Sequence, residues 1–91
     1  MTANTTLRLL PVTEILSARG ARRTKLYDDI KRGIWPPLVK LGRASVQPQH
    51  EVELMVAAIV AGKTDDELQG LVRKVVANRV TAFETLSGRA A

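Results

Sequence analysis

A short helix, a turn and a second short helix are predicted by the apolar positions in the first third of the chain. Between residues 11 and 20 the apolar side chains recur every three or four positions, as on one face of a helix. Before this helix, Leu7 and Leu9 are expected to form a short extended segment that packs on the core. Pro11 suits the first helical turn, where its missing N–H costs nothing, and Gly20 suits the stop. A second helix is expected over residues 22–31, because its apolar positions again share one face. Residues 20–23 would form the turn of a helix-turn-helix arrangement.

A small β-hairpin is predicted after the second helix. Gly33 ends that helix, and the following segment is stiff because each of its two prolines restricts the residue before it to extended geometry. Two strands are expected over residues 38–41 and 44–47, joined by a tight turn at Gly42. A two-stranded hairpin is marginal alone, so it must pack on the helices. Trp35, the only tryptophan, is expected to plug the core beneath the hairpin rather than to stack on a base.

Two further helices complete the predicted mainly α chain. The third runs from Pro48 to a stop at Gly62, and Thr64 with Glu67 matches a capping box that would open a fourth helix over residues 65–86. The fourth helix carries an apolar stripe that is long for so small a domain to cover. We therefore expect a partner chain to cover it, with folding back onto the third helix as the alternative. The residues of this expected dimer contact are Leu68, Leu71, Val72, Val75, Val76, Phe83 and Leu86. Residues 1–6 and 87–91 are expected to be disordered tails.

The charge is concentrated in the first half of the chain. The net charge is +5, but residues 1–47 hold nine Lys and Arg against three acids, whereas residues 48–91 hold five against six. A basic half of this kind suits a polyanion, most often a nucleic acid. The alternatives are a solvated basic surface or an anionic membrane, and the second is disfavoured because the basic half lacks a bulky aromatic insertion face.

The sequence offers no catalytic or metal-binding arrangement. There is no Cys, and His50 is the only His, so neither a disulfide nor a zinc site of the usual ligands is expected, and His50 is assigned to the surface. No nucleophile–base pair and no phosphate-cradling glycine loop is present. We therefore expect no enzyme activity and no cofactor. No apolar run is long enough for a membrane span and no signal peptide is recognisable, which favours a cytoplasmic protein of the bacterial nucleoid.

Residues 7–61 resemble the AlpA-type phage regulators, small MerR-like winged-helix proteins related to excisionases. The resemblance rests on the spacing of the apolar residues in the two short helices and on residues 35–42, WPPLVKLG, which are similar to the family's aromatic-proline stretch and Lys-Leu-Gly turn. Three features depart from the family. Arg22 replaces the usual Ser at the start of the second helix, Gln47 stands where a Trp is common in the wing, and the fourth helix extends beyond the usual domain.

The resemblance implies a winged helix-turn-helix DNA-binding domain over residues 1–62, with residues 63–91 as a helical extension for dimerisation or partner docking. It also implies sequence-specific binding to double-stranded DNA, with the second helix, residues 22–32, in the major groove and the wing, residues 38–47, on the flanking backbone. The positions that would face DNA are Arg22, Arg23, Thr24, Lys25 and Asp28 on the helix and Lys40 and Arg43 on the wing.

The chemistry of these side chains fits such a role. Arg pairs bidentately with guanine, and Lys or Thr meets phosphates and base edges. Asp28 would accept from a cytosine amino group or pair with Arg32 one turn on, and we prefer the ion pair. Tyr27 has two options, a phosphate contact through its hydroxyl or packing in the core.

Three functions remain open from the sequence. The first is a transcription regulator of a phage or mobile element, acting as a homodimer or higher oligomer. The second is an excisionase or DNA-packaging accessory that bends DNA and recruits a recombinase or terminase. The third is an adaptor whose basic patch meets an acidic protein and which binds no DNA.

Overall fold

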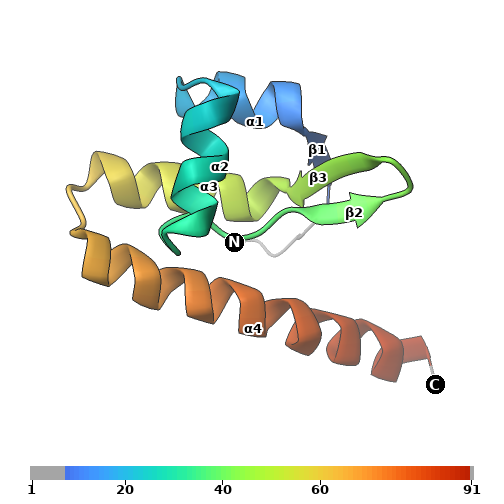
Figure 1. The fold of residues 1–91 in the computed structure, drawn as a ribbon. Helices are drawn as coiled ribbons and strands as arrows, with labels where there is room; N and C mark the ends of the chain where they lie inside the picture. The colour runs from blue at the N-terminus through green and yellow to red at the C-terminus, as the bar shows by residue number, and fades with distance from the viewer. Residues whose placement is uncertain (1–7, 91) are drawn as a thin grey trace.

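The structure, a computed structural model, describes residues 8–90, so the expected N-terminal tail lies outside the described residues. The chain is mainly helical, with one small antiparallel sheet and a long last helix, as the sequence predicts (Figure 1). The elements in chain order are β1 (Leu9–Pro11), α1 (Val12–Arg19), α2 (Arg23–Lys31), β2 (Val39–Leu41), β3 (Ala44–Pro48), α3 (Gln49–Val60) and α4 (Asp65–Ala90).

The sheet has three strands rather than the two of the predicted hairpin. β2 and β3 form the hairpin, with Lys40 paired to Ser45, and β1 adds to the other side of β3, with Leu10 paired to Gln47. Pro11 therefore lies at the end of an edge strand and not in the first helical turn; it precedes α1 with extended backbone angles. An edge strand tolerates proline because one side of its backbone has no ladder partner. The third strand ties the hairpin to the start of α1.

A short left-handed turn separates α1 from α2. Gly20 has a φ of 69°, and its N–H donates to the carbonyl oxygen of Leu16 at 2.9 Å, which confirms the predicted stop. A side chain at this φ would strain the backbone, so glycine is the residue that suits the position. α2 begins at Arg23, one residue later than predicted, and Arg22 is the extended residue in front of it. The two helices are thus joined by only three residues.

One hydrophobic core holds the helices and the sheet together. Trp35 is fully buried at its centre, as predicted, with Ile15 from α1, Leu26 from α2 and Met55 from α3 equally buried around it. Three residues of α4 belong to the same core: Leu68, Val72 and Val75 are only 5–8% exposed. These three residues, assigned from the sequence to a dimer contact, instead pack within their own chain. The first half of α4 is therefore folded back, and the core extends across residue 62.

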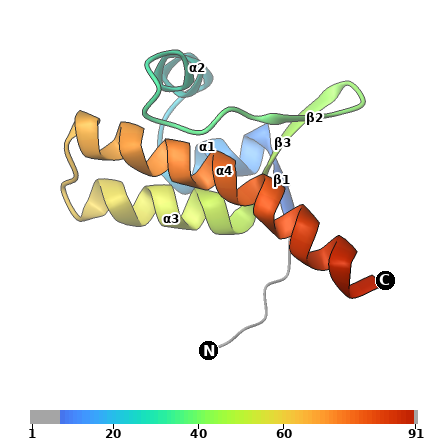
Figure 2. The same cartoon turned by 90° about the horizontal axis from the view of Figure 1, so that it is seen from below.

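α4 starts with the capping box that the sequence predicts. The N–H of Thr64 donates to the Glu67 carboxylate at 2.9 Å, and the N–H of Glu67 donates to the Thr64 hydroxyl at 3.2 Å. The first of these bonds and the charge of Lys63 lower the pKa of Glu67. The helix runs antiparallel to α3 and extends past the N-terminal end of α3 (Figures 1 and 2). It continues to Ala90, so residues 87–90 are helical rather than disordered. Although α4 is long, no helix among residues 8–90 is apolar enough to cross a membrane.

Candidate nucleic-acid interface

The N-terminal end of α2 gathers most of the predicted DNA-facing residues on the surface. Arg22, Arg23, Thr24, Lys25 and Asp28 are all exposed. No side chain caps the helix, and Arg22 occupies the capping position in front of it. The first N–H groups of a helix have no acceptor within it, and the helix dipole adds partial positive charge there. This end of α2 therefore presents backbone donors together with three cationic side chains.

A surface hollow joins α2 to the hairpin. Its volume is about 400 Å³, and both Arg23 from α2 and Arg43 from the β2–β3 turn line it. Two arginines twenty positions apart in the sequence thus border one open space. The remaining lining comes from the β1–α1 junction, from the middle of α2 and from the start of β3: Pro11, Val12, Thr13, Tyr27, Ala44 and Ser45.

The hydroxyl-bearing residues of this hollow are ones that sequence reasoning did not combine with the arginines. Tyr27 is 44% exposed, so of its two predicted roles packing in the core is wrong. The phosphate contact through its hydroxyl stays a prediction. The sequence gives no reason to single out Thr13 or Ser45, because no pattern of the surrounding residues distinguishes either of them. The hollow consequently offers hydroxyl groups beside two guanidinium groups, a set of donors suited to phosphate oxygens.

Lys40 lies on the hairpin but does not line the hollow. It is exposed on β2 and pairs with Ser45 on β3. Its partner Ser45 lines the hollow, so Lys40 lies on the hairpin next to the hollow.

A buried carboxylate anchors α2 to α1. Asp29 is 3% exposed, accepts a hydrogen bond from the Arg19 guanidinium, and accepts another from Lys25 Nζ at 2.9 Å. Burial alone would raise the pKa of Asp29, but the hydrogen bonds and charges of Arg19 and Lys25 outweigh it and hold that pKa below its usual value. The Arg19 guanidinium also lies 4.4 Å from the centre of the Trp35 ring. The orientation of the exposed face of α2 is thus set by a contact on its buried side.

The predicted ion pair between Asp28 and Arg32 is wrong. Arg32 lies just past the last residue of α2, and its guanidinium donates to Asp65 at the start of α4 at 2.8 Å, with Asp29 at 3.8 Å. The amide of Gln69 also donates to the Arg32 carbonyl at 3.1 Å. These contacts attach the end of α2 to α4 and leave the exposed Asp28 carboxylate facing solvent on the same helix as the cations.

A network of buried hydrogen bonds connects the hairpin to α4 through the core. Trp35 Nε1 donates to the side chain of Gln47 at 2.9 Å, and Gln47 donates to Glu51 at 3.3 Å. Glu51, 1% exposed, accepts two hydrogen bonds from Arg79 at 2.6 and 2.7 Å. Arg79 also donates to the carbonyl of Pro37 at 2.8 Å. Gln47 is therefore the acceptor that satisfies the buried indole N–H.

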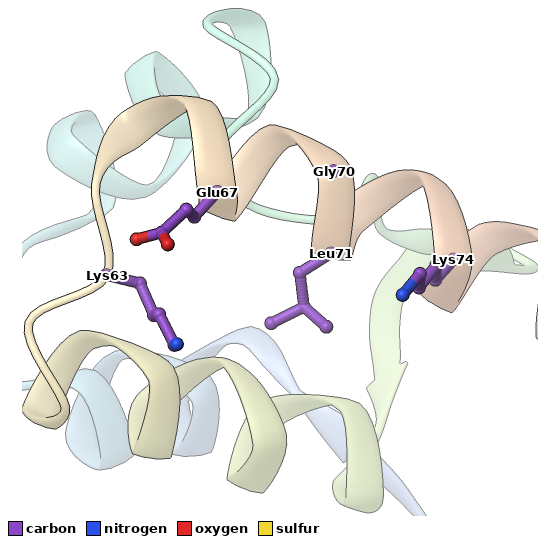
Figure 3. A pocket seen from close by; sticks show the side chains of 5 residues that line it. All are labelled: Lys63, Glu67, Gly70, Leu71 and Lys74. Atoms are coloured by element: carbon purple, nitrogen blue, oxygen red, sulfur yellow. The ribbon is translucent and has the colours of Figure 1, made fainter.

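The remaining residues of the predicted dimer contact line two clefts or lie on open surface. Leu71 is half-buried in a cleft of about 300 Å³ beside α3, and Figure 3 shows its side chain extending from α4 toward α3 with Lys63 and Lys74 on either side. Val76, Phe83 and Leu86 are 37, 70 and 49% exposed. Phe83 and Leu86 line a second cleft, of about 270 Å³, together with Leu9 of β1 and Pro48 at the start of α3.

Comparison of the chain with protein-family models, with curated proteins and with solved structures finds no match.

Proposed function

We propose that this chain is a sequence-specific DNA-binding regulator of the winged helix-turn-helix kind. In this proposal α2 enters the major groove and the β2–β3 hairpin is the wing that contacts the flanking backbone. The observation that carries it is the hollow that Arg23 and Arg43 share, because it brings the helix and the hairpin to one cationic surface. The AlpA-type resemblance supports the same orientation, since its helix and wing positions fall on these two elements.

The uncapped start of α2 supports a phosphate contact next to the base contacts. Its first N–H groups lack a side-chain acceptor, and the exposed Arg22 and Arg23 stand at this end of the helix. An anion at such a helix end gains both hydrogen bonds and the favourable dipole. A DNA phosphate would therefore complete the cap that Arg22 does not provide.

Arg23 and Arg43 have different roles in this proposal. Arg23 lies one position into α2, where an arginine reaches base edges in the major groove, and one bidentate contact with guanine is worth about 1–3 kcal/mol of discrimination. Arg43 lies in the hairpin turn and meets phosphate, which contributes to binding of every sequence alike. Thr24 and Asp28 are the further side chains of α2 that would face the groove.

Binding titrations of three alanine variants test these roles. Arg23→Ala is expected to reduce the preference for a specific duplex over a scrambled one. Arg43→Ala is expected to weaken both equally and to lower the slope of log K against log salt by about one. Arg73→Ala, the same charge change on exposed α4, serves as the matched control and is expected to bind as the wild type does. Equal effects of all three variants would contradict the proposed interface.

A second candidate function is an excisionase or DNA-packaging accessory that binds DNA through the same surface. It is favoured by the exposed apolar residues at the end of α4, which would dock a recombinase or terminase. A bend in the bound DNA together with a footprint longer than two half-sites would select this function over the regulator. Absence of DNA binding at low salt would instead select the adaptor, in which the basic surface meets an acidic protein.

A further inference from the structure

The cleft of about 270 Å³ beside the second half of α4 is formed where this helix passes the N-terminal end of α3 and β1 (Figure 2), and we call it the Arg79 cleft. Its apolar walls are Leu9 of β1, Pro48 at the end of β3, and Ala82, Phe83 and Leu86 of α4. Leu9, Phe83 and Leu86 are 43, 70 and 49% exposed, so the described part of the chain leaves them largely uncovered. A ligand that fills the cleft would remove this apolar surface from water, which favours binding.

The Arg79 guanidinium is the charge that a ligand in the cleft can reach. Glu51 also lines the cleft, but it is 1% exposed and its carboxylate already accepts two hydrogen bonds from Arg79. The side chain of Arg79 is 23% exposed. It uses Nε and Nη2 for its bonds to Glu51 and Pro37, so Nη1 has no acceptor among the described residues. The exposed His50 and Asn78, which complete the lining, can donate further hydrogen bonds.

We propose that the Arg79 cleft binds a small molecule with an apolar body and a single carboxylate group. The apolar body lies against Phe83 and Leu86, and the carboxylate accepts a charge-assisted hydrogen bond from Nη1 of Arg79. The pockets of drug-sized ligands measure about 300–1,000 Å³, so the ligand of this smaller cleft is smaller than those. Octanoate, a fatty-acid anion of medium length, represents this class. An apolar cation is disfavoured, because Arg79 would repel it and the Glu51 carboxylate is covered.

Arg79 connects this cleft to the hairpin. Its Nη2 donates to the carbonyl of Pro37, two residues before β2, at 2.8 Å. A carboxylate on Nη1 leaves that bond in place and restrains the side chain that makes it. Occupancy of the cleft therefore holds the base of the hairpin more firmly and raises the affinity for DNA, since a preorganised surface loses less conformational freedom on binding. That consequence rests on the proposed function, whereas the ligand site does not.

Titration of isotope-labelled protein with octanoate, followed by two-dimensional NMR, tests the site. A ligand of this size is expected to bind with a Kd on the order of 0.1–1 mM and to shift the signals of His50, Asn78 and Phe83 most. Octanol, which has the same chain without the charge, is expected to bind about fivefold more weakly, the ratio that a partly exposed ion pair contributes. Absence of saturable binding, equal binding of octanol, or shifts centred elsewhere on the molecule overturns the proposal.

Two pairs of variants locate the binding. Ala82→Leu fills the cleft and is expected to weaken octanoate binding by about tenfold or more, whereas Thr81→Leu, one position away and outside the lining, should bind as the wild type does. Phe83→Ala removes an exposed wall and should weaken binding severalfold, while Val80→Ala, also exposed but outside the lining, should not. Far-ultraviolet circular dichroism verifies that each variant is folded. Equal binding within either pair overturns the assignment to this cleft.

Fluorescence anisotropy with a DNA duplex, with and without octanoate, tests the connection to the hairpin. Saturating octanoate is expected to lower the Kd for DNA about fivefold, at the low end of usual coupling between sites, and Ala82→Leu should abolish the change. Sodium acetate at the same concentration controls for added salt. Unchanged DNA affinity with the cleft occupied overturns the connection. Absence of DNA binding by a protein that still binds octanoate would instead contradict the proposed function and leave the ligand site standing, so the two failures are distinguishable.

Discussion

Asp29→Asn isolates the contact that holds α2 in place. Asp29 is 3% exposed and accepts hydrogen bonds from Arg19 and Lys25. The substitution keeps the shape of the side chain but removes its charge. Arg19, whose side chain is 6% exposed, then stays buried without an anionic partner. Two of its nitrogens, Nε and Nη1, already have no hydrogen-bond acceptor among the described residues, so little compensation is available.

The expected loss follows from the burial of the pair. Removing one partner of a buried ion pair costs about 3–5 kcal/mol. Lys25 adds little, because its side chain is 54% exposed and an exposed ion pair is worth at most about 1 kcal/mol. The stacking of Arg19 on Trp35 survives and the introduced amide oxygen still accepts one hydrogen bond, so we expect a loss of about 3 kcal/mol. A 91-residue domain has roughly 5–14 kcal/mol in total, and the variant should therefore stay folded but much weakened.

Urea denaturation at two pH values measures the loss in the free energy of unfolding. Asp28→Asn, on the exposed side of the same helix, is the matched control. The pKa of Asp29 is lowered in the folded state, so its contribution to stability is fully present above the unfolded value of about 3.9 and is lost as the pH falls through the folded value. The difference between wild type and Asp29→Asn should be large at pH 7 and should shrink on acidification below pH 4. Equal stability of Asp29→Asn and Asp28→Asn at pH 7, or a difference unchanged by acid, would show that the Asp29 charge does not stabilise the fold.

Three further outcomes follow from other contacts. Arg79→Ala leaves the Glu51 carboxylate buried without a cation and should cost about 2–4 kcal/mol by urea denaturation, whereas a loss below about 1 kcal/mol would show that this pair is not needed to hold α4. Thr64→Ala removes the cap of α4 and should cost about 1 kcal/mol in the same assay, with an unchanged urea midpoint speaking against the cap. Lys40→Ala should weaken binding to all DNA sequences alike and lower the salt slope by about one, and an unaltered slope would remove Lys40 from the interface.

Features encoded by neighbouring residues could be predicted from the sequence. The helix stop at Gly20 and the capping box of Thr64 and Glu67 depend on the chemistry of residues within one turn of each other, and the structure contains both. The burial of Trp35 follows from its size and the two prolines after it. Such signals act locally, so they need no knowledge of what packs against the segment.

Features that depend on distant partners could not be predicted. The spacing of the apolar residues on α4 indicates an apolar face but not what covers it, and α4 uses one side for its own core. Arg32 lies one turn after Asp28 in sequence, yet it pairs with Asp65, because it stands beyond the last helical residue of α2 and close to the start of α4. Arg19 and Asp29 meet only because the turn at Gly20 brings two helices together.

The candidate interface likewise combines features that the sequence predicts with one that depends on distant partners. Exposed basic residues on α2 follow from the charge pattern and from the resemblance. The shared hollow of Arg23 and Arg43 depends on how the hairpin packs beside α2, and the sequence alone gives no distance between them. The extended segment predicted at Leu7 and Leu9 corresponds in part to β1, but the inclusion of Pro11 and the pairing with β3 could not be predicted, because three residues ending in proline have no periodicity.

The proposed function requires that this surface distinguishes DNA sequences, and fluorescence anisotropy of the wild-type protein measures whether it does. The protein is titrated against the duplex upstream of its own gene and against a scrambled duplex of equal composition, each at a low and a higher salt concentration. We expect tighter binding to the native duplex, with a preference that persists when the salt is raised. Equal binding to both duplexes that disappears at the higher salt would contradict it, because the basic surface would then sense only phosphate.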